Sequence, residues 1–216
     1  MPIGIMAEKL GMMGLLFPDG RRVPVTVLQA GPCRVTAVRT VEKDGYAAVQ
    51  LGFKEARSSH LTKALAGQFS SLNLTPPKVL KEFRLAGDST PEVERPKVGD
   101  EVKVDTFQEG VLVDVRGVTK GKGFAGTIKR WHHGRGPTTH GSKSHRRPGS
   151  TGSTDAARVL RGKKSPGHMG DATRTTRGLT VVRIDAEKGL MFVRGAVPGA
   201  NGALLEVRPS LKQGRG

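Results

Sequence analysis

The stretch RVPVTVLQA, residues 22–30, decides the fold class of this chain. Val23, Val25 and Val27 alternate with polar or neutral residues, and this period of two is typical of a half-buried β-strand. Similar short patterns recur, so we predict further strands at residues 34–41, 46–53, 101–105, 111–118, 179–184, 190–197 and 203–208. Many short strands separated by turn residues favour a mainly β protein with a closed antiparallel barrel.

A first interruption of the strand series lies at about residues 54–98. Within it, four large apolar side chains recur at helical spacing: Leu61, Leu65, Phe69 and Leu72. We therefore predict a short helix at 60–72, inside a small α/β insertion whose ends are rich in Pro and in charged residues.

A second interruption, residues 119–177, carries most of the positive charge. The 216-residue chain has a formal charge of +17, and residues 116–177 hold 15 Lys or Arg against two acids. Such a segment repels itself and buries little, so its composition indicates disorder when it is alone. Strands resume after it with normal alternation. We interpret it as a long irregular basic arm that leaves one barrel body, residues 1–118 and 178–216.

The arm attracts polyanions, which in practice means nucleic acid or an anionic membrane surface. A membrane is disfavoured because no apolar run approaches the roughly 18 residues of a spanning helix, and because the arm lacks an apolar stripe. The N-terminus also lacks the pattern of a signal peptide. The single cysteine, Cys33, excludes an intramolecular disulfide and is interpreted as a small core residue. We expect a cytoplasmic protein that binds nucleic acid and no membrane.

Three features of the arm suggest other chemistry, and each is incomplete. GKGFAG at 121–126 matches a dinucleotide-binding pattern, but neither an amphipathic helix nor an acid about 20 residues on follows it. GKKSPGH at 162–168 lacks the Lys-Ser/Thr ending of a phosphate-binding loop. The histidines have no cysteine among them, so we expect no metal and no other cofactor. No Ser-His-Asp arrangement or carboxylate pair is visible, so we expect no catalytic residues and no small-molecule substrate.

RNA fits the arm better than duplex DNA does. Reading a DNA major groove needs a rigid helix or ribbon, whereas this arm is rich in Gly and Pro. It can instead pass between RNA helices while its cations neutralise phosphates and its imidazoles stack or donate. Trp131 is interpreted as a stacking platform. The predicted RNA-binding residues are Lys120, Lys122, Lys129, Arg130, Trp131, His132, His133, Arg135, His140, Lys143, His145, Arg146, Arg147, Arg158, Arg161, Lys163, Lys164, His168, Arg174 and Arg177.

The same residues carry a resemblance to a known family. GVTKGKGFAGTIKR at 117–130, preceded by Phe107 and Asp114, resembles the signature of the ribosomal protein L-three family. Further segments fit that family in the same order: GIMAEKLGMMGLLFPDGRRVPVTVLQAGPCRVTAV (4–38), DGYAAVQLGF (44–53), HGSKSHRRPGS (140–150), GKKSPGHMG (162–170) and VRGAVPGA (193–200). The compact length resembles the bacterial branch.

The resemblance implies a structural component of the large ribosomal subunit with no enzyme activity. It implies binding to 23S rRNA near its 3′ end, early in assembly, and an arm directed toward the peptidyl-transferase centre. It further implies a six-stranded, Greek-key-like barrel of the translation-protein type, with the proteins L-fourteen and L-nineteen as neighbours. Ser153 stands where some bacterial relatives carry a methylated Gln. The alternative function is an RNA chaperone or RNA-processing enzyme that uses the arm to deliver RNA.

Overall fold

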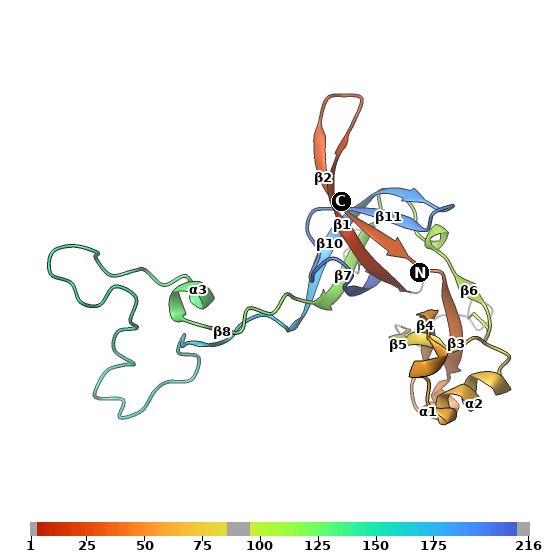
Figure 1. The fold of residues 1–216 in the computed structure, drawn as a ribbon, viewed down its shortest axis with the longest axis horizontal. Coiled ribbons are helices and arrows are strands. Elements are labelled where there is room, and N and C mark those ends of the chain that lie inside the picture. Colours follow the sequence, from red (N-terminus) through yellow and green to blue (C-terminus); the bar gives the residue numbers. More distant parts are fainter. Residues whose placement is uncertain (1–3, 86–95, 211–216) are drawn as a thin grey trace. The chain divides into compact units, whose positions relative to one another are not determined.

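The computed structural model describes residues 4–85 and 96–210 of a mainly β chain (Figure 1). The chain divides into two compact units. Unit 1 is formed by Met1–Val118 and Thr173–Gly216, and unit 2 by Thr119–Ala172.

Six antiparallel strands of unit 1 pair in a closed ring, the barrel that the strand pattern predicts. Around the ring their order is β1 (Ile5–Leu16), β12 (Leu204–Pro209), β7 (Leu112–Val118), β10 (Thr173–Asp185), β11 (Leu190–Arg194) and β2 (Arg22–Ala30). Along β7, Val113 and Val115 are buried while Arg116 is exposed. A period of two therefore places one face of the strand in the core and the other in solvent.

A second sheet has the order β5 (Pro77–Arg84), β4 (Ala48–Glu55), β3 (Cys33–Arg39) and β6 (Glu101–Val102). This sheet corrects the sequence analysis, which assigns β3, β4 and β6 to the barrel body. Among the described residues, these strands pair with each other and with β5, and with no strand of the ring. A two-residue period identifies a strand but not its partners, and this explains the wrong assignment.

The predicted helix at 60–72 is confirmed with shorter bounds, as α2 (Lys63–Ser71). The Thr62 side chain caps it by accepting a hydrogen bond from the Leu65 amide at 3.4 Å. Of the four apolar side chains at helical spacing, only Phe69 is buried. Shorter helical turns in unit 1 are α1 (Val41–Asp44), η1 (Ser58–His60) and η3 (Val104–Thr106).

Three strands differ from their predicted bounds by three residues or more at one end. β10 begins six residues before the predicted strand 179–184. Its register shifts between Thr176 and Leu179, where Gly178 has a φ of +67° and donates its amide to Asp114 Oδ1 at 2.9 Å. The prediction for 101–105 is wrong beyond Val102, where η3 follows, and β11 ends at Arg194 rather than at 197.

One hydrophobic core serves the ring and the second sheet of unit 1. It joins ring residues such as Ile5 and Val115 to sheet residues such as Leu51 and Phe83. Cys33 is fully buried in this core, which confirms its prediction as a core residue. Burial raises the pKa of its thiol to about 11, so the thiol is protonated and unreactive at neutral pH.

Unit 2 has little regular structure. Its elements are β8 (Phe124–Ala125), α3 (Thr127–Trp131) and β9 (Gly167–His168), with β8 and α3 labelled in Figure 1. Over the described parts of both units, no helix combines the length and the apolarity that crossing a bilayer requires.

Candidate nucleic-acid interface

Unit 2 begins and ends in a two-stranded ribbon, residues 119–125 and 167–172. β8 pairs with β9 in antiparallel register, with Phe124 opposite His168 and Ala125 opposite Gly167. Backbone hydrogen bonds extend this pairing toward both ends of the unit: Lys122 N to Met169 O and Met169 N to Gly123 O, each 2.9 Å, Thr119 N to Ala172 O at 3.0 Å, and Asp171 N to Thr119 O at 3.1 Å. The ribbon thus fixes the two ends of unit 2 to each other.

A glycine makes this pairing possible. Gly170 has a φ of +76°, a conformation that side chains disfavour. A Cβ atom at this position would also collide with the carbonyl oxygen of Lys120 on the facing strand. The close approach of the two strands therefore requires glycine here.

The side chains of Arg130 and Trp131 connect α3 to Ser165, which lies just before β9. Arg130 Nη1 and Trp131 Nε1 both donate to the carbonyl oxygen of Ser165, each at 2.9 Å. The Arg130 guanidinium also lies over the indole ring, 5.1 Å from its centroid. α3 ends at Trp131, and the next residue, His132, caps it with a φ of 59° and an amide that donates to Ile128 O. Trp131 is 39% exposed, so part of its ring stays available to a ligand.

Residues 132–164 contain no helix or strand, and their hydrogen bonds are local. His145 Nδ1 lies 2.7 Å from Pro137 O, and the Gly136 amide donates to His145 O at 3.0 Å. Lys163 Nζ donates to Ser150 O at 3.1 Å. These contacts make small turns and leave most side chains to solvent.

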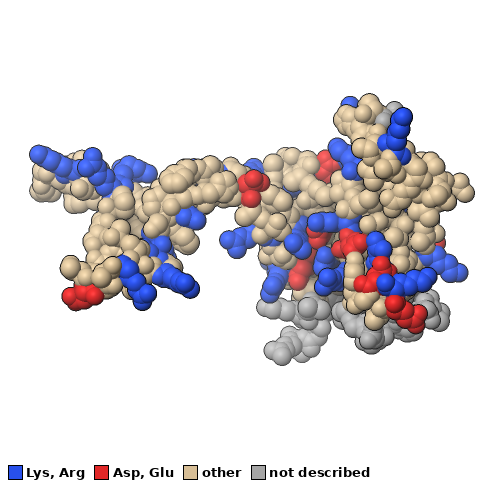
Figure 2. All heavy atoms as spheres, turned by 90° about the horizontal axis from the view of Figure 1, so that it is seen from below, with Lys and Arg blue, Asp and Glu red and all other residues tan. Residues whose placement is uncertain are grey.

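The charges of unit 2 are unbalanced within the unit. It holds twelve Lys or Arg against two Asp, a net charge of +10. All of its residues are described, and none of its cations forms an ion pair. In unit 1, by contrast, Glu206 pairs with Lys81 at 3.3 Å and with Arg208 at 3.1 Å. Figure 2 shows the Lys and Arg side chains of unit 2, on the left, with few acids among them.

The structure places 18 of the 20 predicted RNA-binding residues in unit 2 and the other two, Arg174 and Arg177, on β10. Every one of the 20 is exposed except the half-buried Arg130. Only Arg130 and Trp131 are brought together by contacts between them. In the whole unit, only Ala125 and Thr127 are buried. Unit 2 therefore presents a dispersed cationic surface rather than a cleft.

Sequence reasoning missed Phe124, which is 81% exposed. It lies on β8 directly opposite His168. A signal was available, because Phe124 is an aromatic side chain in a segment of lysines and glycines whose large apolar side chains are few.

The histidines of unit 2 do not form a cluster with other ligand types. Across residues 4–85 and 96–210, no three His, Cys, Asp or Glu side chains gather as metal ligands would. The expectation that the protein needs no metal stays a prediction.

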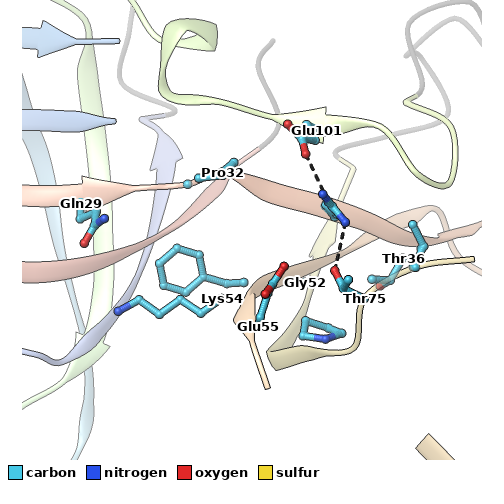
Figure 3. Close-up of a pocket in the computed structure, with 13 residues that line it drawn as sticks. Gln29, Pro32, Thr36, Gly52, Lys54, Glu55, Thr75 and Glu101 are labelled. Atoms are coloured by element: carbon cyan, nitrogen blue, oxygen red, sulfur yellow. Dashed lines mark hydrogen bonds and ion pairs between the residues drawn. The ribbon is translucent and has the colours of Figure 1, made fainter. Parts of the chain in front are cut away.

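Unit 1 has a cavity of about 220 Å³ beside β3 and β4 (Figure 3). Three of its polar side chains bond to one another: Arg34 Nε donates to Glu101 Oε1 at 3.2 Å, and Arg34 Nη1 donates to Thr75 Oγ1 at 3.0 Å. The guanidinium of Arg34 is thus held between a carboxylate and a hydroxyl of the cavity lining.

Known proteins resemble this chain over nearly its whole length. The family model described as Ribosomal protein L3 matches residues 82–190. A large ribosomal subunit protein uL3 from Carboxydothermus hydrogenoformans is 46% identical over 212 residues, which cover 98% of this chain and 99% of the relative. The proteins of the same name from Heliobacterium modesticaldum and Fervidobacterium nodosum are 48% and 47% identical, over 97% of this chain and 97% and 99% of the relatives.

Proposed function

The chain belongs to the ribosomal protein L3 family, and from this premise we propose that it is a structural constituent of the large ribosomal subunit that binds 23S rRNA through unit 2. Proteins of this family are parts of the ribosome and not enzymes, so the prediction of a non-enzymatic protein is confirmed. The 20 predicted RNA-binding residues are the proposed contact set.

One observation carries the proposal: unit 2 has a net charge of +10 and none of its cations is paired within it. Exposed cations without carboxylate partners bind phosphates with release of counterions, which makes binding strongly salt-dependent. A mainly irregular chain with many glycines can follow the surface of folded RNA, since it brings its backbone close to the phosphates.

We also propose where on 23S rRNA the protein binds and at which stage of assembly. We place the contact near the 3′ end of 23S rRNA, early in assembly, with the arm at residues 119–177 directed toward the peptidyl-transferase centre. The body is a Greek-key-like barrel of the translation-protein type, and the protein works in the cytoplasm. These statements are what the family resemblance implies.

The outer part of the β1–β2 hairpin supports contacts with neighbouring proteins, for which L-fourteen and L-nineteen are the proposed candidates. Residues 10–18 contain no charged side chain. Within them, Met12 is 53% exposed and Leu16 is 77% exposed. Arg22 pairs with Leu16 across the hairpin, so cations flank this segment. Its exposed apolar side chains themselves suit a protein partner better than they suit phosphates.

Fractionation of a cell lysate on a sucrose gradient tests the proposal. At moderate salt we expect stoichiometric cosedimentation with large subunits, because a structural constituent has one place per particle. A mostly free pool would contradict this and favour the RNA chaperone or RNA-processing enzyme. High salt should release the protein only when it also loosens the particle, since many phosphate contacts must break together.

Replacing Trp131 with Ala should weaken binding to 23S rRNA by about 1–3 kcal/mol, because a base that stacks on the indole loses its partner. The slope of log affinity against log salt should stay nearly unchanged, because stacking releases no ions. Titrations at several salt concentrations measure both quantities.

Trp131→Phe is the matched control, because it keeps an aromatic face and removes the hydrogen bond to Ser165 O. If the Phe variant binds as poorly as the Ala variant, then Trp131 acts by fastening α3 and not by stacking. A changed slope in either variant would contradict the stacking role.

A further inference from the structure

Phe124 is exposed in a way that its chemistry does not favour. With 81% of its surface accessible, it has the largest exposed fraction among the large hydrophobic side chains of the described residues. Single hydrophobic side chains are often exposed on protein surfaces, so exposure alone does not assign a role to Phe124. The residues around the ring decide what it can bind.

The backbone beneath Phe124 is fixed. Phe124 lies on β8 directly opposite His168 on β9. Beside this pair, the amide of Met169 donates to the carbonyl oxygen of Gly123 at 2.9 Å. Ala125, the next residue along β8, is only 3% exposed. Because successive side chains of a strand point to opposite faces, Ala125 faces inward and Phe124 faces solvent.

His168 adds a second flat ring on the same face. Directly opposed residues of antiparallel strands have Cβ atoms about 4.5–5.5 Å apart and side chains on one face. His168 is exposed as well. The ribbon therefore presents a phenyl ring and an imidazole side by side, and both belong to residue types on which nucleobases stack.

The charge around the pair favours nucleic acid over a protein. Lys120 and Lys122 precede Phe124 on the same strand of the ribbon, and Asp171 on the facing strand is its one acid. The other exposed large apolar side chains of unit 2, apart from Trp131, are Val159 and Leu160, far along the chain. A lone aromatic pair flanked by lysines lacks the apolar surround of a protein-binding hot spot.

We propose that Phe124 and His168 form a stacking platform for an unpaired nucleotide of the bound RNA, separate from Trp131. The platform accepts any base, because every base has a π-face. Lys120 and Lys122 neutralise the adjoining phosphates. This inference rests on the proposed function, and it assigns a task to a residue outside the predicted contact set.

Affinity for purified 23S rRNA tests the platform with three variants. We expect Phe124→Ala and Phe124→Leu each to lower the affinity about 5- to 100-fold, with the salt slope unchanged. Phe124→Tyr should bind as the unaltered protein does, because it keeps the aromatic face. Leu160→Ala, which truncates an apolar side chain that is 59% exposed in the same unit, is the matched control and should bind normally.

Tryptophan fluorescence gives a second measurement, when the only Trp of the chain is moved to position 124. A Phe124→Trp and Trp131→Phe double variant has its single Trp on the platform, and its emission should fall when 23S rRNA binds, since a stacked base quenches the indole. Thermal melting should be the same for the three single variants of Phe124, because little of the Phe124 side chain is buried. Equal melting separates lost stacking from lost folding.

Three outcomes would overturn the platform. Normal rRNA affinity in Phe124→Ala is the first, and undiminished emission in the double variant is the second. The third is a Phe124→Leu variant that binds rRNA normally and loses only a protein neighbour, which would make Phe124 a protein anchor. In each case, the proposed function would still hold if the unaltered protein binds 23S rRNA in a salt-dependent way. If the unaltered protein does not bind 23S rRNA, the proposed function itself is refuted.

Discussion

Replacing residues 119–172 with Asn-Gly is expected to leave a soluble protein that unfolds cooperatively and has lost nearly all affinity for 23S rRNA. Val118 and Thr173 are directly paired, so a two-residue turn can join β7 to β10. The core consists of residues of unit 1. Unit 2 contributes only Ala125 and Thr127 as buried residues, so its removal exposes little apolar surface.

The expected loss of affinity follows from the charge. The replacement removes twelve of the 36 Lys and Arg residues and lowers the net charge from +17 to +7. At a salt concentration of about 0.1 M, each phosphate contact adds roughly 0.7–0.9 of a decade to the binding constant. Even if only some of the twelve cations meet phosphates, several orders of magnitude disappear.

Circular dichroism melting and rRNA titrations measure the two results. A control variant that replaces only residues 132–164 with a Gly-Ser link keeps the ribbon, and it should retain the part of the affinity that depends on the ribbon. Aggregation or a broad, non-cooperative melt of the full replacement would show that unit 2 belongs to the core. Undiminished rRNA affinity would place the interface in unit 1.

The sequence identifies strands well where valines alternate without interruption. β2 has its predicted bounds, β7 begins one residue later than predicted, and β12 is shifted by one residue at both ends. β1 escapes this pattern because Lys9 is buried inside it and glycines break the alternation. Lys9 is tolerated because its ammonium donates to the carbonyls of Val197 and Gly199, each at 3.1 Å. A local sequence pattern cannot predict these hydrogen-bond acceptors, because they lie 188 and 190 residues from Lys9.

The assignment of strands to sheets shows the same limit. β3 has a two-residue period like that of β2, yet one joins the second sheet and the other the ring. The choice depends on which distant strands each can pair with. Those pairings depend on the whole fold, which a window of nine residues does not contain.

For the candidate site, composition predicts the cationic surface but not the contacts that hold its aromatic side chains in place. The net charge of a segment is the sum over its residues, so the excess of Lys and Arg over Asp and Glu can be counted directly from the sequence. The contact of Trp131 with Ser165 joins residues 34 positions apart, and the pairing of Phe124 with His168 depends on the ribbon register. Both arise from folding of the segment and are invisible in its composition.

Replacing four cations of unit 2 with Gln should flatten the salt dependence of rRNA binding by roughly three units of slope, if each meets one phosphate. The four are Arg146, Arg147, Lys163 and Lys164, all exposed and without a carboxylate partner. The one hydrogen bond given up by their side chains is that of Lys163 to Ser150 O. Because no helix or strand includes these residues, the melting temperature should not change.

A second quadruple variant, with Arg21, Arg34, Arg39 and Lys54 replaced by Gln, is the matched control. These four cations lie in unit 1, and each already pairs with a carboxylate. A cation held by a carboxylate releases few counterions when RNA arrives, so the slope should change much less than in the unit 2 variant. Equal changes in both variants would mean that net charge alone governs binding. An unaltered slope in the unit 2 variant would mean that these four cations stay solvated in the complex and that the phosphate contacts lie elsewhere.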